Sequence, residues 1–217
     1  MNEKETALAL ANFLLQIKAI KLNPANPFTW ASGLKSPIYC DNRITLSYPN
    51  IRTFIREAFV KMCTERYGKP DLIAGVATGG IPQGALVAQE LGLPFCYVRS
   101  EAKSHGLNNQ VEGIVPQGAS VIVIEDLVST GKSSLAAVEA LREKGANVKG
   151  MMAIFTYQLP AAAEAFKNAG CDLVTISNYE ALIAKAVEEK YVSDDQMASL
   201  MEWRKNPQAW SEAHQTC

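Results

Sequence analysis

The chain has 217 residues, of which 48% are hydrophobic and 20% charged, and its formal net charge is -1. At roughly 100–200 residues per domain, this length allows one large domain, or one domain with a small accessory piece. The near-neutral charge excludes a global basic field for nucleic acid or an anionic membrane, so any phosphate site has to be local.

The N-terminal segment predicts a helix rather than a targeting signal. Residues 4–21 place Leu10, Phe13, Leu14 and Ile17 at helical spacing, and the acidic start does not match a signal peptide. No run of about 18 or more apolar residues exists, so no membrane span is expected. The five scattered cysteines form no C-x-x-C pair, which favours reduced thiols and a cytoplasmic location.

Residues 22–67 combine an irregular segment with a second helix. Residues 22–47 are rich in Pro, Asn and Ser, with one short extended piece at 38–40. Pro49 suits the first turn of a helix, which is expected to end by Gly68.

From residue 68 onward, short apolar runs alternate with helical stretches. The runs are 72–77, 95–98, 121–124, 148–155 and 173–176, and the helices fall near 81–91, 132–144, 160–168 and 179–189. This alternation predicts an α/β fold with a central parallel sheet flanked by helices. The whole chain is expected to be a single domain, with a core at about 68–178 and a small cap from 1–67 and 179–217.

Two capping boxes predict late helix starts, at Ser177 with Glu180 and at 193–196. The last helix is expected to turn Leu200 and Met201 inward, together with Met197, before the chain continues as a polar tail.

The strongest chemical signal is the sequence VIVIEDLVSTGKSS at 121–134. A buried strand leads into Glu125 and Asp126, and a turn rich in hydroxyl groups then opens a helix. Free N–H groups at a helix start favour a phosphate, and two acids suit ribose hydroxyls or a hydrated Mg²⁺. A Walker A loop would need a glycine at position 126, where this chain has an aspartate, so that alternative is rejected.

Segment 121–134 resembles the phosphoribosyl pyrophosphate motif of the type I phosphoribosyltransferases, which implies their fold. The resemblance implies that Glu125 and Asp126 hold the ribose hydroxyls, with Asp126 also catalytic. The loop after these acids would bind the 5′-phosphate through Leu127, Val128, Ser129, Thr130, Gly131, Lys132 and Ser133. No direct metal ligand is assigned, because Mg²⁺ is expected to arrive on the substrate, near Asp126.

The segment YVRSEAKSHG at 97–106 places Arg99, Lys103 and His105 just beyond a strand. It resembles the catalytic loop of orotate phosphoribosyltransferases, which implies that these three residues bind phosphoribosyl pyrophosphate and act in catalysis. Members commonly carry a second basic residue where this chain has Ser100, so one phosphate contact is absent. The polar stretch from Gly106 to Gly113 is expected to be mobile.

Two further segments resemble the same family. FTWASGLKSPIYCDNR at 28–43 resembles its orotate-binding segment, which implies base contacts from Tyr39 and Cys40, with Ser129 from the phosphate loop. Some members carry a lysine at the position of Ala31, and Lys35 is an open substitute. GVATGGIPQG at 75–84 resembles its pyrophosphate loop, formed by Ala77, Thr78, Gly79 and Gly80, and the resemblance implies a cis peptide between Ala77 and Thr78. The family often has a lysine in place of Gly79.

AIFTYQLP at 153–160 lacks the arginine that many members direct at the substrate carboxylate. With EWRKNP at 202–207, it resembles a bacterial subgroup of orotate phosphoribosyltransferases, and the resemblance covers about residues 28–210. It implies transfer of phosphoribose from phosphoribosyl pyrophosphate to orotate with Mg²⁺, in a homodimer with shared active sites. The alternatives are a phosphoribosyltransferase for another base, and a regulator that binds nucleic acid. The 28–43 segment argues against the first, and the neutral charge argues against the second.

Overall fold

A six-stranded sheet in the order β10-β9-β8-β5-β6-β7 forms the centre of the structure. Its parallel strands are β5 (Leu72–Val76), β6 (Phe95–Val98), β8 (Ser120–Val128), β9 (Asn147–Thr156) and β10 (Leu173–Asn178), with β7 (Val111–Glu112) antiparallel at one edge. The structure is a computed structural model that describes residues 1–30, 32–100 and 110–215. The predicted α/β fold with a parallel sheet is confirmed.

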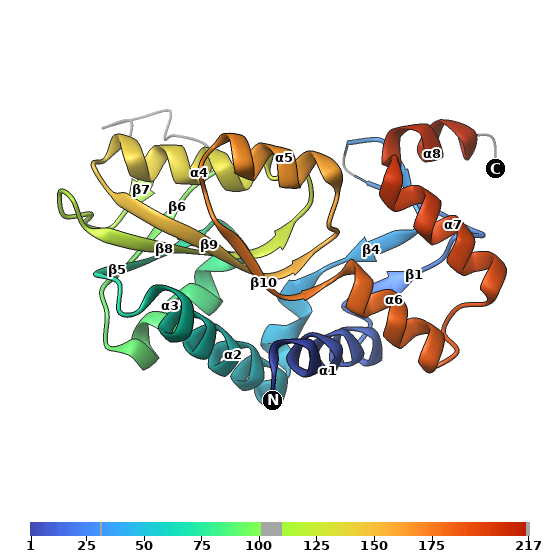
Figure 1. The fold of residues 1–217 in the computed structure, drawn as a ribbon, viewed down its shortest axis with the longest axis horizontal. Coiled ribbons are helices and arrows are strands. Elements are labelled where there is room, and N and C mark those ends of the chain that lie inside the picture. Colours follow the sequence, from blue (N-terminus) through green and yellow to red (C-terminus); the bar gives the residue numbers. More distant parts are fainter. Residues whose placement is uncertain (31, 101–109, 216–217) are drawn as a thin grey trace.

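Helices cover both faces of this sheet (Figure 1). On one face lie α1 (Glu3–Gln16), α2 (Pro49–Tyr67) and α3 (Gly80–Leu91), and on the other lie α4 (Lys132–Glu143) and α5 (Pro160–Asn168). Successive residues of β8 serve the two faces in turn: Ile122 and Ile124 join one hydrophobic cluster, and Val121 and Val123 join the other. This is why the run is apolar throughout rather than alternating.

The order of the strands reverses between β5 and β8. The chain runs from β5 outward to β6, then returns to place β8 on the other side of β5 and continues to β9 and β10. Ligands of open parallel sheets bind at such a reversal, beyond the carboxyl ends of the two strands. The fold therefore predicts a ligand site at the loops that follow β5 and β8.

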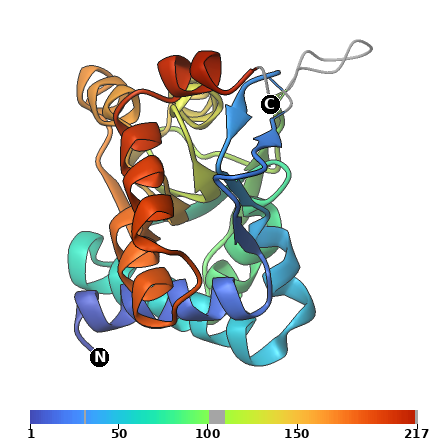
Figure 2. The ribbon, with the colours of Figure 1, turned by 90° about the vertical axis from the view of Figure 1, so that its right-hand side faces the viewer.

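Beside the sheet stands a smaller part, which we call the cap and which Figure 2 views face on. It contains α6 (Tyr179–Glu188), α7 (Asp194–Lys205), α8 (Pro207–Ala213), the short 3-10 helix η1 (Asn42–Ser47) and four short strands. The strands are β1 (Ile20–Leu22), β2 (Phe28–Thr29), β3 (Lys35–Ser36) and β4 (Ile38–Cys40), paired as β1 with β4 and β2 with β3. The predicted boundary between core and cap stays a prediction; α1 and α2, which it assigns to the cap, also contact the sheet.

Two local expectations are corrected and one is confirmed. The first helix ends at Gln16, not near residue 21, because Lys18 has a φ of 57° and residues 20–22 form β1. The cap of α6 is Asn178, whose side chain accepts the Ala181 N–H. Ser177 instead donates its hydroxyl to the carbonyl of Ala7 at 2.7 Å. The capping box at 193–196 is confirmed.

The inward face of α7 also differs from the expectation. Leu200 is fully buried, but Met201 is 38% exposed, and the fully buried partner is Trp203. Residues 207–213 are helical rather than a polar tail, and Trp210 lies buried within them. Among the described residues, no helix combines the length and apolar character needed to cross a membrane.

The neighbouring positions 200 and 201 give a matched test of this packing. Leu200→Ala should lower the free energy of unfolding by about 2–5 kcal/mol, because it leaves a cavity in a closed core. Met201→Ala should change it by no more than about 0.5 kcal/mol, since the side chain is partly exposed. Urea denaturation of both variants measures the difference. An equal loss in both would contradict the observed orientation of α7.

Candidate functional site

Two helices begin after the neighbouring strands β5 and β8, at the reversal of strand order, and neither has a side-chain cap. α3 follows the loop after β5 with Gly79 at its N-cap, and α4 follows the loop after β8 with Gly131 at its N-cap. Gly131 has a φ of 83°, which a glycine adopts without strain. Uncapped N–H groups at a helix start attract anions. The site therefore offers two neighbouring places for phosphate groups.

The loops after β5 and β8 approach each other so closely that side chains do not fit between them. A Cβ on Gly79 would collide with the Asp126 carboxylate, and one on Gly80 would collide with the carbonyl of Ile124. The Ala77–Thr78 peptide is cis, as the family resemblance implied. Any side chain at position 79 would therefore need Asp126 to move.

Strand β8 continues to Val128, so the two acids lie within its last residues rather than after it. Glu125 is only 5% exposed, and its carboxylate accepts hydrogen bonds from the Ser134 hydroxyl and from the Asp126 N–H, both at 2.9 Å. Burial, and then the neighbouring charge of Asp126, raise the pKa of Glu125 well above its ordinary value. The two acids are therefore not equivalent.

Asn42 ties the 38–43 segment to these acids. Its side-chain amide donates to the carbonyl of Asp126 at 2.6 Å, and its own backbone carbonyl accepts the Thr45 hydroxyl at 2.6 Å. Asn42 is 1% exposed. Sequence reasoning did not single it out; its position two residues after Cys40 was the available signal.

Tyr39 and Cys40 are the last two residues of strand β4, close to Asp126. The Tyr39 side chain is exposed and its ring lies 5.7 Å from that of Phe28. Burial and the nearby charge of Asp126 raise the pKa of the Cys40 thiol, whose Sγ lies 3.4 Å from Oδ1 of Asn42. The structure thus brings the predicted base-binding segment to the acids of β8.

Arg99 follows β6, one strand away from β5. Its N–H donates to the carbonyl of Gln110 at 2.8 Å, and its guanidinium lies 3.6 Å from the carboxylate of Glu112. Lys103 and His105 lie outside the described residues, as does Ala31. In the phosphate loop, Thr130, Lys132 and Ser133 are exposed and Ser129 is partly exposed.

The FTY-x-LP and EWRKNP segments contact each other. Tyr157 is buried, stacks on Trp30 at 5.4 Å and meets Trp203 edge-on at 5.4 Å. The side-chain oxygen of Gln158 accepts the Glu180 N–H at 3.0 Å and lies 3.4 Å from the Arg204 guanidinium. These contacts join the end of β9 to α6 and α7.

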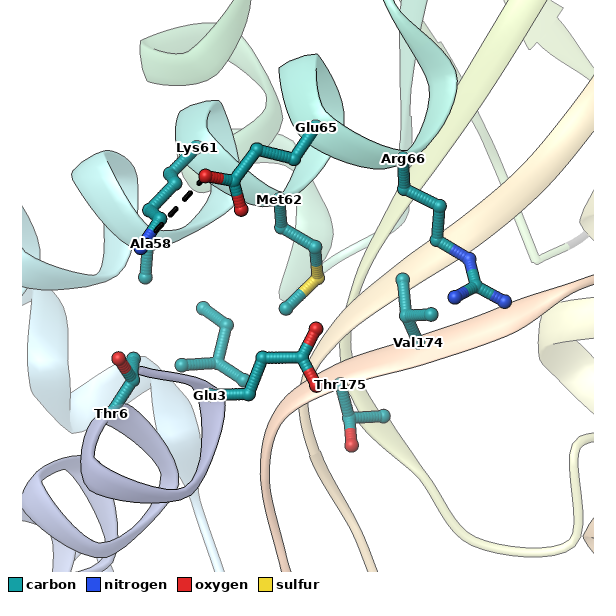
Figure 3. A pocket seen from close by; sticks show the side chains of 10 residues that line it. Glu3, Thr6, Ala58, Lys61, Met62, Glu65, Arg66, Val174 and Thr175 are labelled. Atoms are coloured by element: carbon teal, nitrogen blue, oxygen red, sulfur yellow. Dashed lines mark ion pairs between the residues drawn. The ribbon is translucent and has the colours of Figure 1, made fainter. Parts of the chain in front are cut away.

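A pocket of about 440 Å³ lies away from this site, over β10 between α1 and α2 (Figure 3). Its walls include Thr6, Met62 and Val174, and Lys61 and Glu65 form an ion pair of 3.9 Å at its rim. None of the site residues named from the sequence lines it. In the described part of the chain, no group of three His, Cys, Asp or Glu side chains is arranged to hold a metal.

Comparison with known proteins gives consistent results. The phosphoribosyl transferase domain family matches residues 46–183. The chain is 58% identical to an orotate phosphoribosyltransferase of Bacteroides thetaiotaomicron over 200 residues, which cover 92% of this chain and 94% of that protein. It is 52% identical to an orotate phosphoribosyltransferase of Listeria monocytogenes over 93% of this chain and 96% of that protein.

Solved structures agree with the sequence matches. The crystal structure of orotate phosphoribosyltransferase from Aeropyrum pernix is similar with a TM-score of 0.73 and 28% identity, over 85% of this chain and 99% of that one. UMP synthase of Leishmania donovani is similar with a TM-score of 0.75 and 27% identity, over 91% of this chain and 42% of that one.

The burial of Glu125 predicts a pH-dependent stability. A carboxyl whose folded pKa is raised binds its proton more tightly in the fold, so stability falls as pH rises from about 4.5 towards the raised pKa. Glu125→Gln should therefore raise the melting temperature, by about 2–4 °C for each kcal/mol gained in the free energy of unfolding. The gain should be larger at pH 8 than at pH 5. Thermal unfolding at both pH values measures it.

Glu164→Gln, at an exposed position of α5, controls for the loss of one negative charge. A gain for Glu125→Gln that is the same at pH 5 and pH 8, or that the control reproduces, would contradict the assignment of a raised pKa.

Proposed function

The chain belongs to the orotate phosphoribosyltransferases of the type I phosphoribosyltransferase family, and on that basis we propose how its own residues carry out the reaction. The enzyme transfers the 5-phosphoribosyl group from phosphoribosyl pyrophosphate to orotate, giving orotidine 5′-monophosphate and pyrophosphate in pyrimidine biosynthesis. Orotate N1 forms the new bond to ribose C1 while the bond from C1 to pyrophosphate breaks. Positive charge then develops on the ribose and negative charge on the leaving group.

The phosphates of the substrate are proposed to bind at the two uncapped helix starts. The loop from Leu127 to Ser133 holds the 5′-phosphate at the start of α4, and Thr130 and Ser133 add exposed hydroxyl groups. The loop from Ala77 to Gly80 holds the pyrophosphate at the start of α3. Glycines at both N-caps let the backbone N–H groups approach the phosphates closely.

Asp126 is proposed to hold the ribose between these phosphates. Its carboxylate lies against Gly79, at the boundary of the two loops, and so faces the point where a bound ribose would link them. Negative charge placed there favours the positively charged ribose of the transition state. Glu125 supports this arrangement from the buried side, where it binds Ser134 and the Asp126 N–H.

The leaving pyrophosphate is proposed to be neutralised by cations. Arg99 stands at the end of β6, and Lys103 and His105 belong to the same role by the family resemblance. Mg²⁺ suits this site, because it is commonly held by one or two carboxylates together with substrate phosphates, and Asp126 offers such a carboxylate. When bound, it would neutralise charge on the pyrophosphate.

The base is proposed to bind beside the end of β4, against the backbone groups of Tyr39 and Cys40 and the hydroxyl of Ser129. The observation that carries the proposal is the contact of this segment with the acids, through the hydrogen bond from Asn42 to Asp126. This contact supports the proposal, because it brings segment 38–43 next to Asp126, the residue proposed to hold the ribose.

We further propose that the enzyme works in the cytoplasm as a homodimer in which the loop after Arg99 completes the partner's active site. Its cysteines are scattered along the chain, and the four that the structure describes are free, which fits that compartment. No nucleic acid or membrane partner is proposed, in keeping with the net charge of -1.

A panel of bases tests the function. With phosphoribosyl pyrophosphate and Mg²⁺, kcat/KM should favour orotate over uracil, hypoxanthine and adenine. A site built to pair a carboxylate leaves donors unpaired when uracil binds, so the preference should be on the order of 10⁴-fold. Comparable use of uracil, or a preference for a purine, would overturn the assignment of the base while leaving phosphoribosyl transfer intact.

Mixed dimers test the shared site. Asp126→Asn alone should lose about 100-fold or more in turnover with little change in melting temperature, and Lys103→Ala should also be impaired. In a random mixture half of the dimers are hybrids with one intact site out of two, so about a quarter of wild-type activity should return. No recovery after confirmed subunit exchange would contradict loop sharing.

A further inference from the structure

The carboxylate of orotate has no obvious cation among the residues proposed above to contact the base. Tyr157 and Gln158, near the position where many family members carry an arginine, have no charge at neutral pH, and Tyr157 is only 2% exposed. Backbone N–H groups of Tyr39 and Cys40 donate hydrogen bonds but supply no full positive charge. A charge-assisted partner is roughly twice as strong as a neutral one, so a site selective for a carboxylate would gain from a nearby cation.

Three cations of the cap are candidates: Lys35, Arg204 and Arg43. Lys35 lies in β3, whose backbone is tied to α8 by a hydrogen bond from the Lys35 N–H to the Ser211 hydroxyl at 2.8 Å. Arg204 is engaged with Gln158 at 3.4 Å, and its guanidinium lies 5.9 Å from the centre of the Tyr179 ring. Neither the contact of Lys35 nor those of Arg204 involve Asp126 or the residues bonded to it.

Arg43 differs from both because its segment touches the acids. It directly follows Asn42, whose side chain donates to the carbonyl of Asp126 at 2.6 Å, and it lies three residues beyond Cys40. The side chains of Asp126 and Tyr39 contribute, after that of Asp41, to the raised pKa of Arg43. The guanidinium is therefore close enough to the side chains of Asp126 and Tyr39 for their charges to act on it.

Asp41 holds the Arg43 side chain in a fixed orientation. Nε of Arg43 lies 2.7 Å from Oδ1 of Asp41, and Nη2 lies 3.0 Å from Oδ2. This pairing uses one edge of the guanidinium, and the Nη1 side keeps N–H donors. The Arg43 side chain is 57% exposed, so an arriving anion can reach it.

We infer that Arg43 is the cation that pairs with the orotate carboxylate, and that Asp41 is a positioning residue that orients it. The inference rests on the proposed function and deepens it, because it names a determinant of base specificity. The planar N–H fork of arginine matches a carboxylate, and a guanidinium already held by Asp41 loses less side-chain freedom when orotate binds. Arg43 thus lies between two carboxylates, one from the protein and one from the substrate.

Steady-state kinetics of Arg43→Gln test this inference. Hydrogen bonds to charged groups contribute about 1.5–3 kcal/mol, so kcat/KM for orotate should fall by about 10- to 150-fold, mainly through KM. KM for phosphoribosyl pyrophosphate should stay unchanged, as should the inhibition constant of uracil, a competitor without the carboxylate. Arg43→Lys should recover part of the loss, because it keeps the charge and loses the fork. Lys35→Gln is the matched control and should behave as wild type.

Two outcomes would overturn the inference. A loss of orotate use in Lys35→Gln but not in Arg43→Gln would assign the carboxylate to Lys35. An equal rise in KM for orotate and for phosphoribosyl pyrophosphate would place Arg43 at the phosphates. If Arg43→Gln does not fold, Asp41→Asn replaces it and should lower kcat/KM for orotate alone; an unchanged value would refute the positioning role. Failure of the wild type itself to use orotate would instead refute the proposed function.

Discussion

The contact between Gly79 and Asp126 is the constraint on which the site depends. Parallel strands β5 and β8 are neighbours, so the loops at their carboxyl ends lie close together. Because Gly79 has no side chain, the Asp126 carboxylate occupies the space where the Cβ of residue 79 would lie. Two helix starts and one acid thereby meet within a single small region. A Cβ at this position would already collide with the Asp126 carboxylate, so any side chain at residue 79 would need Asp126 to move.

The cap depends on a second interaction, the aromatic packing around Trp203. This side chain meets the rings of Trp30, Tyr157 and Tyr179 at 5.4–5.7 Å, so residues from α6, α7 and the loops after β2 and β9 share one buried centre. The end of β9 contributes a buried tyrosine, Tyr157, to that cluster. The cluster therefore provides apolar contact between the end of the sheet and the cap.

The sequence predicted the sheet well because its signals are local. Apolar runs bounded by turns mark strands, and Glu125 and Asp126 stand beside a helix start in the chain itself. The cap was predicted less well for the opposite reason. Strands of two or three residues carry no periodicity, and β1 pairs with β4 across a long irregular segment. Asn42 acts through a hydrogen bond to a residue 84 positions away. Met201 was taken for a core residue in place of Trp203, because the two positions lie on either side of the buried Leu200 around the helix and the spacing alone does not say which side faces inward.

The inequality of the two acids follows from strand geometry. Neighbouring residues of a strand point to opposite faces. Glu125 points to the face that α4 covers, where its carboxylate accepts the hydroxyl of Ser134. Asp126 points to the face that α3 covers, where its carboxylate fits because Gly79 has no side chain. Two full negative charges on adjacent residues would repel each other as well as the phosphates of the substrate. Burying one carboxyl, and so favouring its neutral form, lets the site present a negative charge to the ribose from Asp126 while Glu125 holds the backbone N–H beside it.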